Sequence, residues 1–247
     1  MEMYDNFAYL YDELMNDFDY EQWFEYIKEI FHKYNKNPVD ILEMACGTGS
    51  LSYYIGKEGY KLTCFDLSEE MLSIAYEKLK RLKNVKILRQ DMTRFTINKK
   101  FDSVISICDS INYILDREDL LKTFTNVYNH LNDDGIFIFD MNSYYKLKEV
   151  IGNNVFVEDR DNIYYTWQNN YDDVKDICEF YLTFFYSEDG ENFIRFDEKH
   201  LEKAYKNEEI ISLLKEAGFP NIEVYDGFSF NSPGKKSERI NYVATKI

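Results

Sequence analysis

A short glycine-rich turn near residue 47 constrains the fold of this chain more than any other feature. The apolar run 39–42 leads into Glu43, and the small residue Ala45 and the turn 46–49 follow, before a helix-like segment over 51–59. A strand, a tight turn and a helix N-terminus form the usual device by which a parallel α/β sheet holds a nucleotide-like ligand. Glycines in such a turn let the backbone approach the ligand closely and adopt a positive φ at little cost.

The spacing of the glycines separates this turn from a dinucleotide-binding one. The dinucleotide fingerprint has glycine at its first, third and sixth positions, but here Gly47 and Gly49 are followed by Ser52 at the sixth. Glu43, just before the turn, would repel a pyrophosphate, because like charges repel. The turn therefore favours a nucleoside-like ligand with a positively charged end.

Three more acids follow predicted strands, at the edge where such sheets bind ligands. Asp66 lies 17 residues beyond Gly49, at the spacing expected for a carboxylate that accepts both ribose hydroxyls. Asp91 and Asp109 end the next two predicted strands in the same way. Because parallel strands align their carboxyl ends, we expect these three acids and Glu43 to share one site.

Strand-like and helix-like segments alternate through the first 141 residues. This alternation predicts an α/β fold with a doubly wound parallel sheet and helices on both faces. Two later segments, 221–225 and 240–245, are expected to close it as an antiparallel pair, which makes seven strands, and a last helix precedes them at 207–217. The remaining predicted strands are 39–43, 60–66, 85–91, 101–109 and 135–141, and the clearest helices between them are 68–83 and 117–131.

The run acid-x-small-x-Gly-x-Gly at 43–49 resembles motif I of the class I methyltransferases that use S-adenosylmethionine (AdoMet). Asp-Leu-Ser-x-x-Met-Leu at 66–72 is also typical of that family. The resemblance covers residues 4–141 and implies a Rossmann-like fold, AdoMet as cofactor, and methyl transfer to nitrogen or oxygen of a small-molecule acceptor by in-line displacement. Glu43 replaces the commoner Asp and Ala45 a frequent Gly, and both changes preserve charge or small size.

The same resemblance implies which residues contact the cofactor. Asp66 would bind the ribose, Asp91 the adenine amino group, and the acid before the turn the cationic methionine end. The expected cofactor-binding residues are Glu43, Ala45, Cys46, Gly47, Gly49, Asp66, Leu67, Met71, Asp91, Met92 and Cys108.

After residue 141 the pattern changes to four extended segments separated by turn-forming residues. They predict a small antiparallel β-sheet inserted into the main domain. We expect an AdoMet-binding domain over 1–147 and 202–247, and an inserted substrate-side subdomain over 148–201. The aromatic residues of this subdomain could line the acceptor-binding site, or they could pack the inserted sheet against the main domain. The segments are 154–159, 162–171, 177–186 and 193–201.

Two aromatic helices are expected ahead of the sheet, as a cap over 1–35. The pattern Tyr-x-x-Phe-Ala-x-x-Tyr-Asp at 4–12 resembles the opening of small-molecule methyltransferases, including sugar-amine N-methyltransferases. In that subgroup the first helix closes over AdoMet and substrate, which makes Tyr11 the best functional candidate among the tyrosines. Plain packing of an aromatic helix face is the alternative.

Methyl transfer from a sulfonium needs mainly proximity and alignment, because the leaving group is neutral and already activated. A side chain could still remove a proton from the acceptor. The candidates for this catalytic role are Tyr11, Asp109, Tyr113 and His200, although a lone His is more often a packing residue. No metal-ligand spacing is present, so no metal is expected.

The formal net charge of −16 disfavours nucleic acid and anionic membrane surfaces as partners, since both carry negative charge. Four cysteines form no CxxC pair, and no signal peptide or membrane-spanning run is evident. We therefore expect a cytoplasmic protein, monomeric or homodimeric, whose partner is a small-molecule methyl acceptor.

Two alternatives remain open from the sequence. A nicotinamide-dependent oxidoreductase or epimerase would use the Tyr-x-x-x-Lys pair Tyr144 and Lys148, although Ser52 and Glu43 count against this reading. A non-catalytic AdoMet-binding protein would keep the cofactor motifs, because methyl transfer leaves no obligatory catalytic residue in the sequence.

Overall fold

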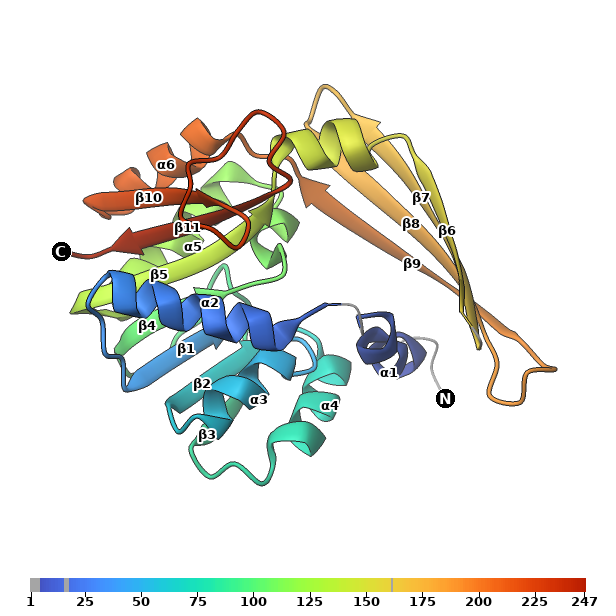
Figure 1. Cartoon of the computed structure of the whole chain (residues 1–247), viewed down its shortest axis with the longest axis horizontal. Helices are drawn as coiled ribbons and strands as arrows, with labels where there is room; N and C mark the ends of the chain where they lie inside the picture. The colour runs from blue at the N-terminus through green and yellow to red at the C-terminus, as the bar shows by residue number, and fades with distance from the viewer. Residues whose placement is uncertain (1–4, 16–17, 161) are drawn as a thin grey trace.

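A seven-stranded mixed sheet forms the centre of the computed structural model, which describes residues 5–15, 18–160 and 162–247 (Figure 1). The strand order is β10-β11-β5-β4-β1-β2-β3, and β11 runs antiparallel to both of its neighbours. The predicted α/β sheet with its antiparallel closing pair is thereby confirmed. The strands are β1 (Asp40–Met44), β2 (Lys61–Asp66), β3 (Val85–Arg89), β4 (Phe101–Ser106), β5 (Leu131–Asn142), β10 (Asn221–Asp226) and β11 (Arg239–Thr245).

Helices cover both faces of this sheet, as a doubly wound fold requires. Alternate residues of a strand point to opposite faces, so Val104 and Ile105 of β4 belong to two separate hydrophobic cores. α5 (Arg117–His130) and α6 (Asn207–Glu216) pack on the first core. On the second core lie α2 (Tyr20–Lys33), α3 (Ser50–Lys57) and α4 (Glu69–Leu79).

The strand order reverses between β1 and β4, which places the carboxyl ends of these two strands at the switch point of the sheet. Ligands bind α/β sheets in the crevice outside such a point. α4 begins as predicted at Ser68, whose hydroxyl accepts the N–H of Met71 at 3.1 Å. It ends at Leu79 rather than near residue 83, because Leu82 closes a turn onto the carbonyl of Leu79 before β3.

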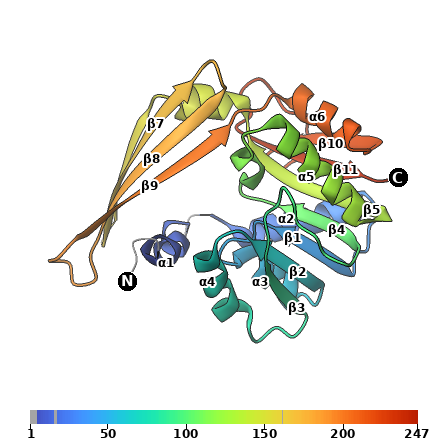
Figure 2. The same ribbon diagram turned by 180° about the vertical axis from the view of Figure 1, so that it is seen from behind.

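A separate four-stranded antiparallel sheet projects from the main domain (Figures 1 and 2). Its long strands connect to the main domain through the π-helical segment η2 (Lys146–Ile151) on one side and lead into α6 on the other. The strands, in sheet order, are β6 (Val155–Arg160), β7 (Ile163–Asp172), β8 (Ile177–Tyr186) and β9 (Ile194–Lys203).

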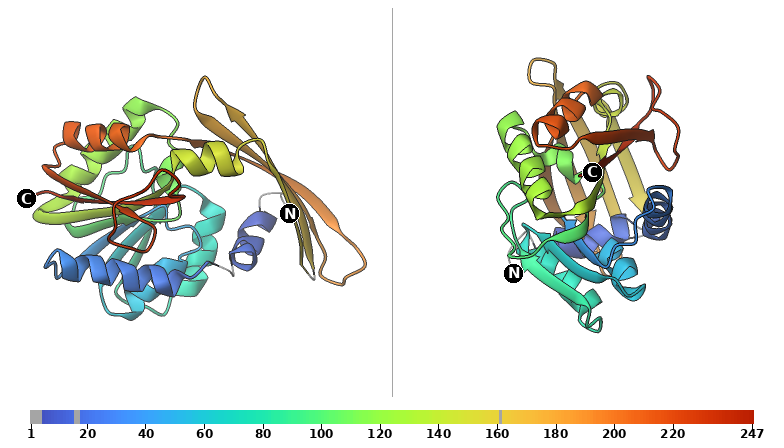
Figure 3. Two further views of the ribbon diagram at one scale, coloured as in Figure 1. Left: turned by 45° about the horizontal axis from the view of Figure 1, so that its top comes forward. Right: turned by 90° about the vertical axis from the view of Figure 1, so that its left-hand side faces the viewer.

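One face of this second sheet packs against α1 (Asp5–Leu14), which lies between the two sheets (Figure 3). Leu10 of α1 is buried with Ile163, Phe184 and Phe196. The other face is open to solvent, with Tyr164 of β7 37% exposed. The aromatics of the insertion therefore divide between packing and exposure, as strand alternation predicts.

α1 and α2 confirm the two predicted N-terminal helices, although Tyr4 of the aromatic pattern lies outside the described residues. The loop after β10 packs on α2, since the ring of Phe228 is centred 4.7 Å from that of Trp23. In the part of the chain that the structure describes, no helix is both long and apolar enough to cross a membrane.

Candidate functional site

The glycine turn between β1 and α3 has an unusual backbone. Ala45, Gly47 and Gly49 adopt left-handed φ values of 52°, 53° and 76°. A Cβ added at Gly49 would lie 3.0 Å from Leu79 Cδ1 and 3.1 Å from Ala75 Cβ, so only glycine lets α4 pack closely here. The turn therefore combines a left-handed backbone, which the glycine pattern predicted, with close packing of α4 against Gly49.

Asp66, at the tip of β2, holds this turn in place. Its two carboxylate oxygens accept hydrogen bonds from the backbone N–H groups of Gly47 and Ser68, at 2.8 and 2.9 Å. The backbone N–H of Cys46 donates to the carbonyl of Phe65 at 3.0 Å. Asp66, which the sequence places 17 residues beyond Gly49, is thus in direct contact with the glycine turn.

Asp91, beyond β3, is the next acid along the same edge. Partial burial opposes its ionisation, but the backbone N–H and hydroxyl of Thr93, at 2.9 and 2.8 Å, and Arg94, at 3.1 Å, lower the pKa of the carboxyl. Asp91 is therefore an anion at neutral pH. Beside these acids, Leu67 is 61% exposed and available to cover a ligand.

Glu43 lies at the end of β1 with only 2% of its surface exposed. Burial raises its pKa to about 8 and the charge of Asp66 adds to the shift, while a hydrogen bond from the Ser52 hydroxyl opposes it. A buried carboxylate is costly unless a cation accompanies it. Glu43 is thus suited to a positively charged ligand group. The hydroxyl of Ser52, a residue that the sequence analysis treated only as the absence of a third glycine, donates a hydrogen bond to the Glu43 carboxylate.

The first helix is tied to the glycine turn by a polar cluster that no sequence pattern indicated. Asp12 of α1 accepts the hydroxyl hydrogen of Thr48 at 2.5 Å and pairs with Lys78 of α4 at 2.9 Å. Lys78 also donates to the hydroxyl of Ser50 at 2.7 Å. Cap, turn and α4 therefore meet at one point.

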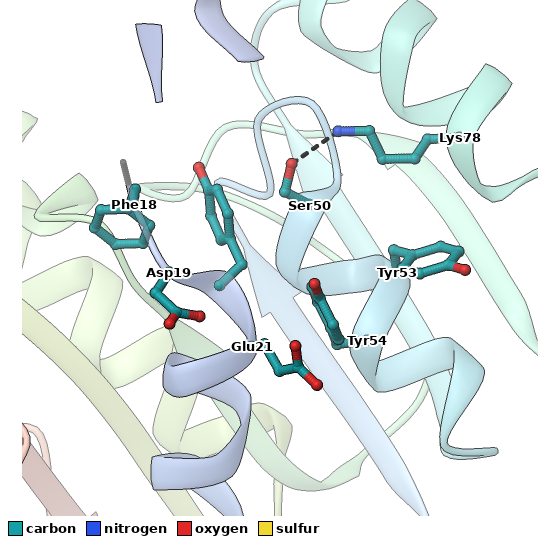
Figure 4. Close-up of a pocket in the computed structure, with 8 residues that line it drawn as sticks. Phe18, Asp19, Glu21, Ser50, Tyr53, Tyr54 and Lys78 are labelled. Carbon is teal, nitrogen blue, oxygen red and sulfur yellow. Dashed lines mark hydrogen bonds between the residues drawn. The ribbon is translucent and has the colours of Figure 1, made fainter. Parts of the chain in front are cut away.

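A pocket of about 630 Å³ opens beside this cluster (Figure 4). It lies where α2 and α3 begin, and the hydrogen bond between Lys78 and Ser50 spans its rim. Its walls are mainly aromatic and acidic, and none of its lining residues was a sequence candidate. The lining residues are Phe18, Asp19, Tyr20, Glu21, Ser50, Tyr53, Tyr54 and Lys78.

The turn after β4 is the second left-handed turn at the site. Cys108 and Asp109 have φ values of 60° and 52°. The carboxylate of Asp109 lies 3.0 Å from Nη1 of Arg239, which also pairs with the fully buried Asp140 of β5. The negative charge of Asp109 is therefore already engaged, and Arg239 is a site residue that the sequence analysis missed.

The four catalytic candidates come from four different elements and converge. The hydroxyl of Tyr113, in the 3₁₀ segment η1 (Ser110–Tyr113), lies 3.5 Å from Nδ1 of His200 on β9. Burial raises the pKa of Tyr11, and Cys108, Tyr20 and Asp109 add to the shift. Asp109 and Tyr11 also lie within electrostatic reach of Tyr113. Burial lowers the pKa of His200, so its imidazole is neutral at pH 7.

The other sequence features have ordinary partners. Tyr144 donates to Asp176 at 3.0 Å and Lys148 pairs with Asp173 at 2.7 Å, so the Tyr-x-x-x-Lys pair is engaged with the inserted sheet. His130 accepts the N–H of Ile97 at its Nε2. Among the described residues, no group of three or more His, Cys, Asp or Glu side chains is placed to hold a metal ion.

Comparisons with known proteins agree on one family. Residues 41–135 match the family model described as a methyltransferase domain. The "Putative methyltransferase YqeM" of Bacillus subtilis (strain 168) is 35% identical over 245 residues, which cover 99% of this chain and 97% of that protein.

Solved structures give the same result. An S-adenosylmethionine-dependent methyltransferase from Clostridium acetobutylicum superposes with a TM-score of 0.89 at 42% identity, over 99% of both chains. The sugar N-methyltransferase KedS8 from Streptoalloteichus sp. has a TM-score of 0.77 over 99% of this chain and 92% of that one, but at 17% identity it shows the fold alone.

Proposed function

Because this chain belongs to the AdoMet-dependent methyltransferases, we propose that it methylates nitrogen or oxygen of a small molecule bound between α1, the turn after β4 and β9. The convergence of Tyr11, Asp109, Tyr113 and His200 from separate elements carries this proposal. Tyr11 and Tyr113 interact electrostatically with Asp109, and His200 contacts Tyr113, so the four side chains lie together beside the switch point of the sheet.

The residues at the sheet edge fit AdoMet group by group. Glu43 suits the ammonium and sulfonium because it is buried beside the turn, and Asp66 suits the ribose hydroxyls. Asp91, an anion beyond β3, suits the adenine amino group. When bound, AdoMet supplies a methyl group on a sulfonium, whose departure leaves a neutral thioether.

The protein's own contribution is alignment and proton removal. Holding the acceptor in line replaces an encounter in solution with an oriented contact, which accounts for most of the acceleration required. His200 is neutral at pH 7 and can take the proton that an amine or hydroxyl loses. The hydroxyl of Tyr113 contacts Nδ1 of His200 and so orients the imidazole ring.

A small acceptor is favoured over a polymer by charge and by enclosure. The net charge of −16 would repel nucleic acid. Tyr11 of α1 lies near Asp109 and Tyr113, and His200 of β9 contacts Tyr113, so an acceptor bound there would have to fit between α1 and the second sheet.

The test is a turnover assay with methyl-labelled AdoMet and a panel of amines, phenols and hydroxy acids, read as S-adenosylhomocysteine formed. We expect turnover with one class, and a loss of at least about 10-fold in kcat for His200→Gln, which general-base catalysis predicts. Tyr181→Phe, on the exposed face of β8, is the matched control and should be silent.

Two results would contradict the proposal. Label transferred only to protein or RNA would exclude a small-molecule acceptor. Tight AdoMet binding without turnover on any acceptor class would instead favour the non-catalytic AdoMet-binding alternative.

A further inference from the structure

Arg239, the first residue of β11, joins three parts of the molecule at the edge of the site. Its Nη1 lies 3.0 Å from Oδ1 of Asp109 and also pairs with Oδ2 of Asp140. Asp140 is fully buried and the side chain of Arg239 is 20% exposed. Removing charges from water is costly, and replacing a buried ion pair by apolar residues is often neutral or stabilising. Stability alone therefore does not account for this pair.

The turn that Arg239 contacts is strained. Cys108 and Asp109 are consecutive non-glycine residues in the left-handed region, where each costs about 1–3 kcal/mol unless its surroundings hold it. Asp140 faces the backbone N–H of Asp109 at 3.3 Å, and Arg239 binds the Asp109 carboxylate. The backbone N–H of Asp109 thus contacts β5, and its carboxylate contacts β11.

The same guanidinium reaches the N-terminal cap. Its Cζ lies 5.8 Å from the ring centroids of both Phe18 and Trp23. Trp23, in the first turn of α2, is only 1% exposed, so its ring is fixed in the core. Arg239 therefore contacts the turn after β4 on one side and the start of α2 on the other.

We propose that Arg239 is a positioning residue that holds the Cys108–Asp109 turn in its left-handed conformation and fixes this turn against Phe18 and Trp23. AdoMet binding beside the turn and the environment of Trp23 then depend on each other through one guanidinium. In this proposal Arg239 acts through the turn, since its charge partners, Asp109 and Asp140, both belong to the protein. The inference concerns the cofactor site and does not depend on which acceptor is methylated.

The experiment follows Trp23 as a reporter. The chain has only two tryptophans, Trp23 and Trp167, so Trp167→Phe leaves Trp23 as the single emitter. In this background AdoMet is titrated while tryptophan emission is recorded, and its Kd is measured by calorimetry. The variants are Arg239→Lys, Arg239→Met and Asp109→Asn. Arg195→Met is the matched control, because Arg195 forms an exposed pair with Asp197 on β9, at 3.0 Å.

We expect AdoMet to change Trp23 emission in the parent. Arg239→Met should abolish this change and raise the Kd at least 10-fold. Arg239→Lys should recover part of both, because it keeps the charge but not the planar fork that contacts two carboxylates. Arg195→Met should behave as the parent.

The proposal is overturned if Arg239→Met and Asp109→Asn both bind AdoMet within 2-fold of the parent with the same Trp23 response. A parent whose Trp23 emission ignores AdoMet would refute the coupling. Should Arg239→Met fail to fold, Asp109→Asn and Arg239→Lys decide, since each removes or alters the same ion pair with a smaller change.

Discussion

The carboxylate of Asp66 accepts a hydrogen bond of 2.8 Å from the backbone N–H of Gly47, so the tip of the second strand fixes the turn that follows the first. A second bond, from the N–H of Ser68 at 2.9 Å, starts α4 from the same carboxylate. One side chain thus shapes the turn and presents oxygen acceptors at the ligand-binding edge of the sheet. The loss of this carboxylate should therefore affect the turn as well as the cofactor expected beside it.

Replacing Asp66 by Ala or Asn should weaken AdoMet binding at least about 10-fold, since hydrogen bonds to a charged group contribute about 1.5–3 kcal/mol each. Calorimetric titration measures the change. Asp172→Ala is the matched control, because Asp172 also accepts two backbone N–H groups, from Val174 and Lys175, but in a distant hairpin. Unchanged AdoMet affinity in both Asp66 variants would show that the site has been misplaced.

Two glycines with the same φ of 76° separate backbone strain from crowding. At Gly49 a Cβ would meet Leu79 and Ala75 at 3.0 and 3.1 Å, whereas at Gly190 nothing lies within 4 Å. Gly190→Ala should cost about 1 kcal/mol from the left-handed conformation alone. Gly49→Ala should cost about 1–3 kcal/mol more, because overpacking displaces α4. Urea unfolding measures both, and equal costs would refute the role of close packing at the turn.

The sequence predicted the strand tips well because each is a local pattern. An apolar run followed by an acid identifies a strand end without any tertiary information, so Glu43 and Asp66 were placed correctly at the ends of β1 and β2, whereas β3 ends at Arg89, two residues before Asp91. The glycine spacing likewise reports a backbone conformation that is fixed within a few residues.

Arg239, Asp12 and Lys78 could not be predicted in this way. Their contacts join residues far apart in the chain, and a single charged residue in a chain with 29 Lys and Arg carries no pattern of its own. Asp109 shows the consequence: the sequence placed it at the end of a strand, although β4 ends at Ser106, and its ion pair with Arg239 was not predictable at all. Such pairs depend on which strands neighbour each other, and that is set by the packing of the whole sheet.

Asp12 and Thr48 should be energetically coupled, because their hydrogen bond of 2.5 Å ties the cap to the glycine turn. A double-mutant cycle of Asp12→Asn and Thr48→Val, read as the free energy of unfolding, should give a coupling of about 0.5–1.5 kcal/mol for a partly exposed pair. The exposed pair of Lys122 and Asp119 is the control and should give a coupling near zero. Additive effects of the two substitutions would mean that the hydrogen bond between Asp12 and Thr48 does not stabilise the packing of α1 against the glycine turn.

The buried Glu43 should make both stability and cofactor affinity depend on pH. Its pKa is raised from 4.5 to about 8 in the folded protein, so folding binds a proton between these values. This contribution to stability is fully present below pH 4.5 and is lost as the pH rises through 8, with a slope of at most about 1.4 kcal/mol per pH unit. AdoMet has the opposite effect, because its positive charge favours the carboxylate, so binding should release a proton and strengthen as the pH rises towards 8. Calorimetry in buffers of different ionisation enthalpy measures the number of protons released on AdoMet binding.

The variant Glu43→Gln keeps the shape of the side chain but cannot ionise. It should flatten the dependence of stability on pH and abolish the proton release on AdoMet binding. Proton release that persists in this variant would have to come from another group.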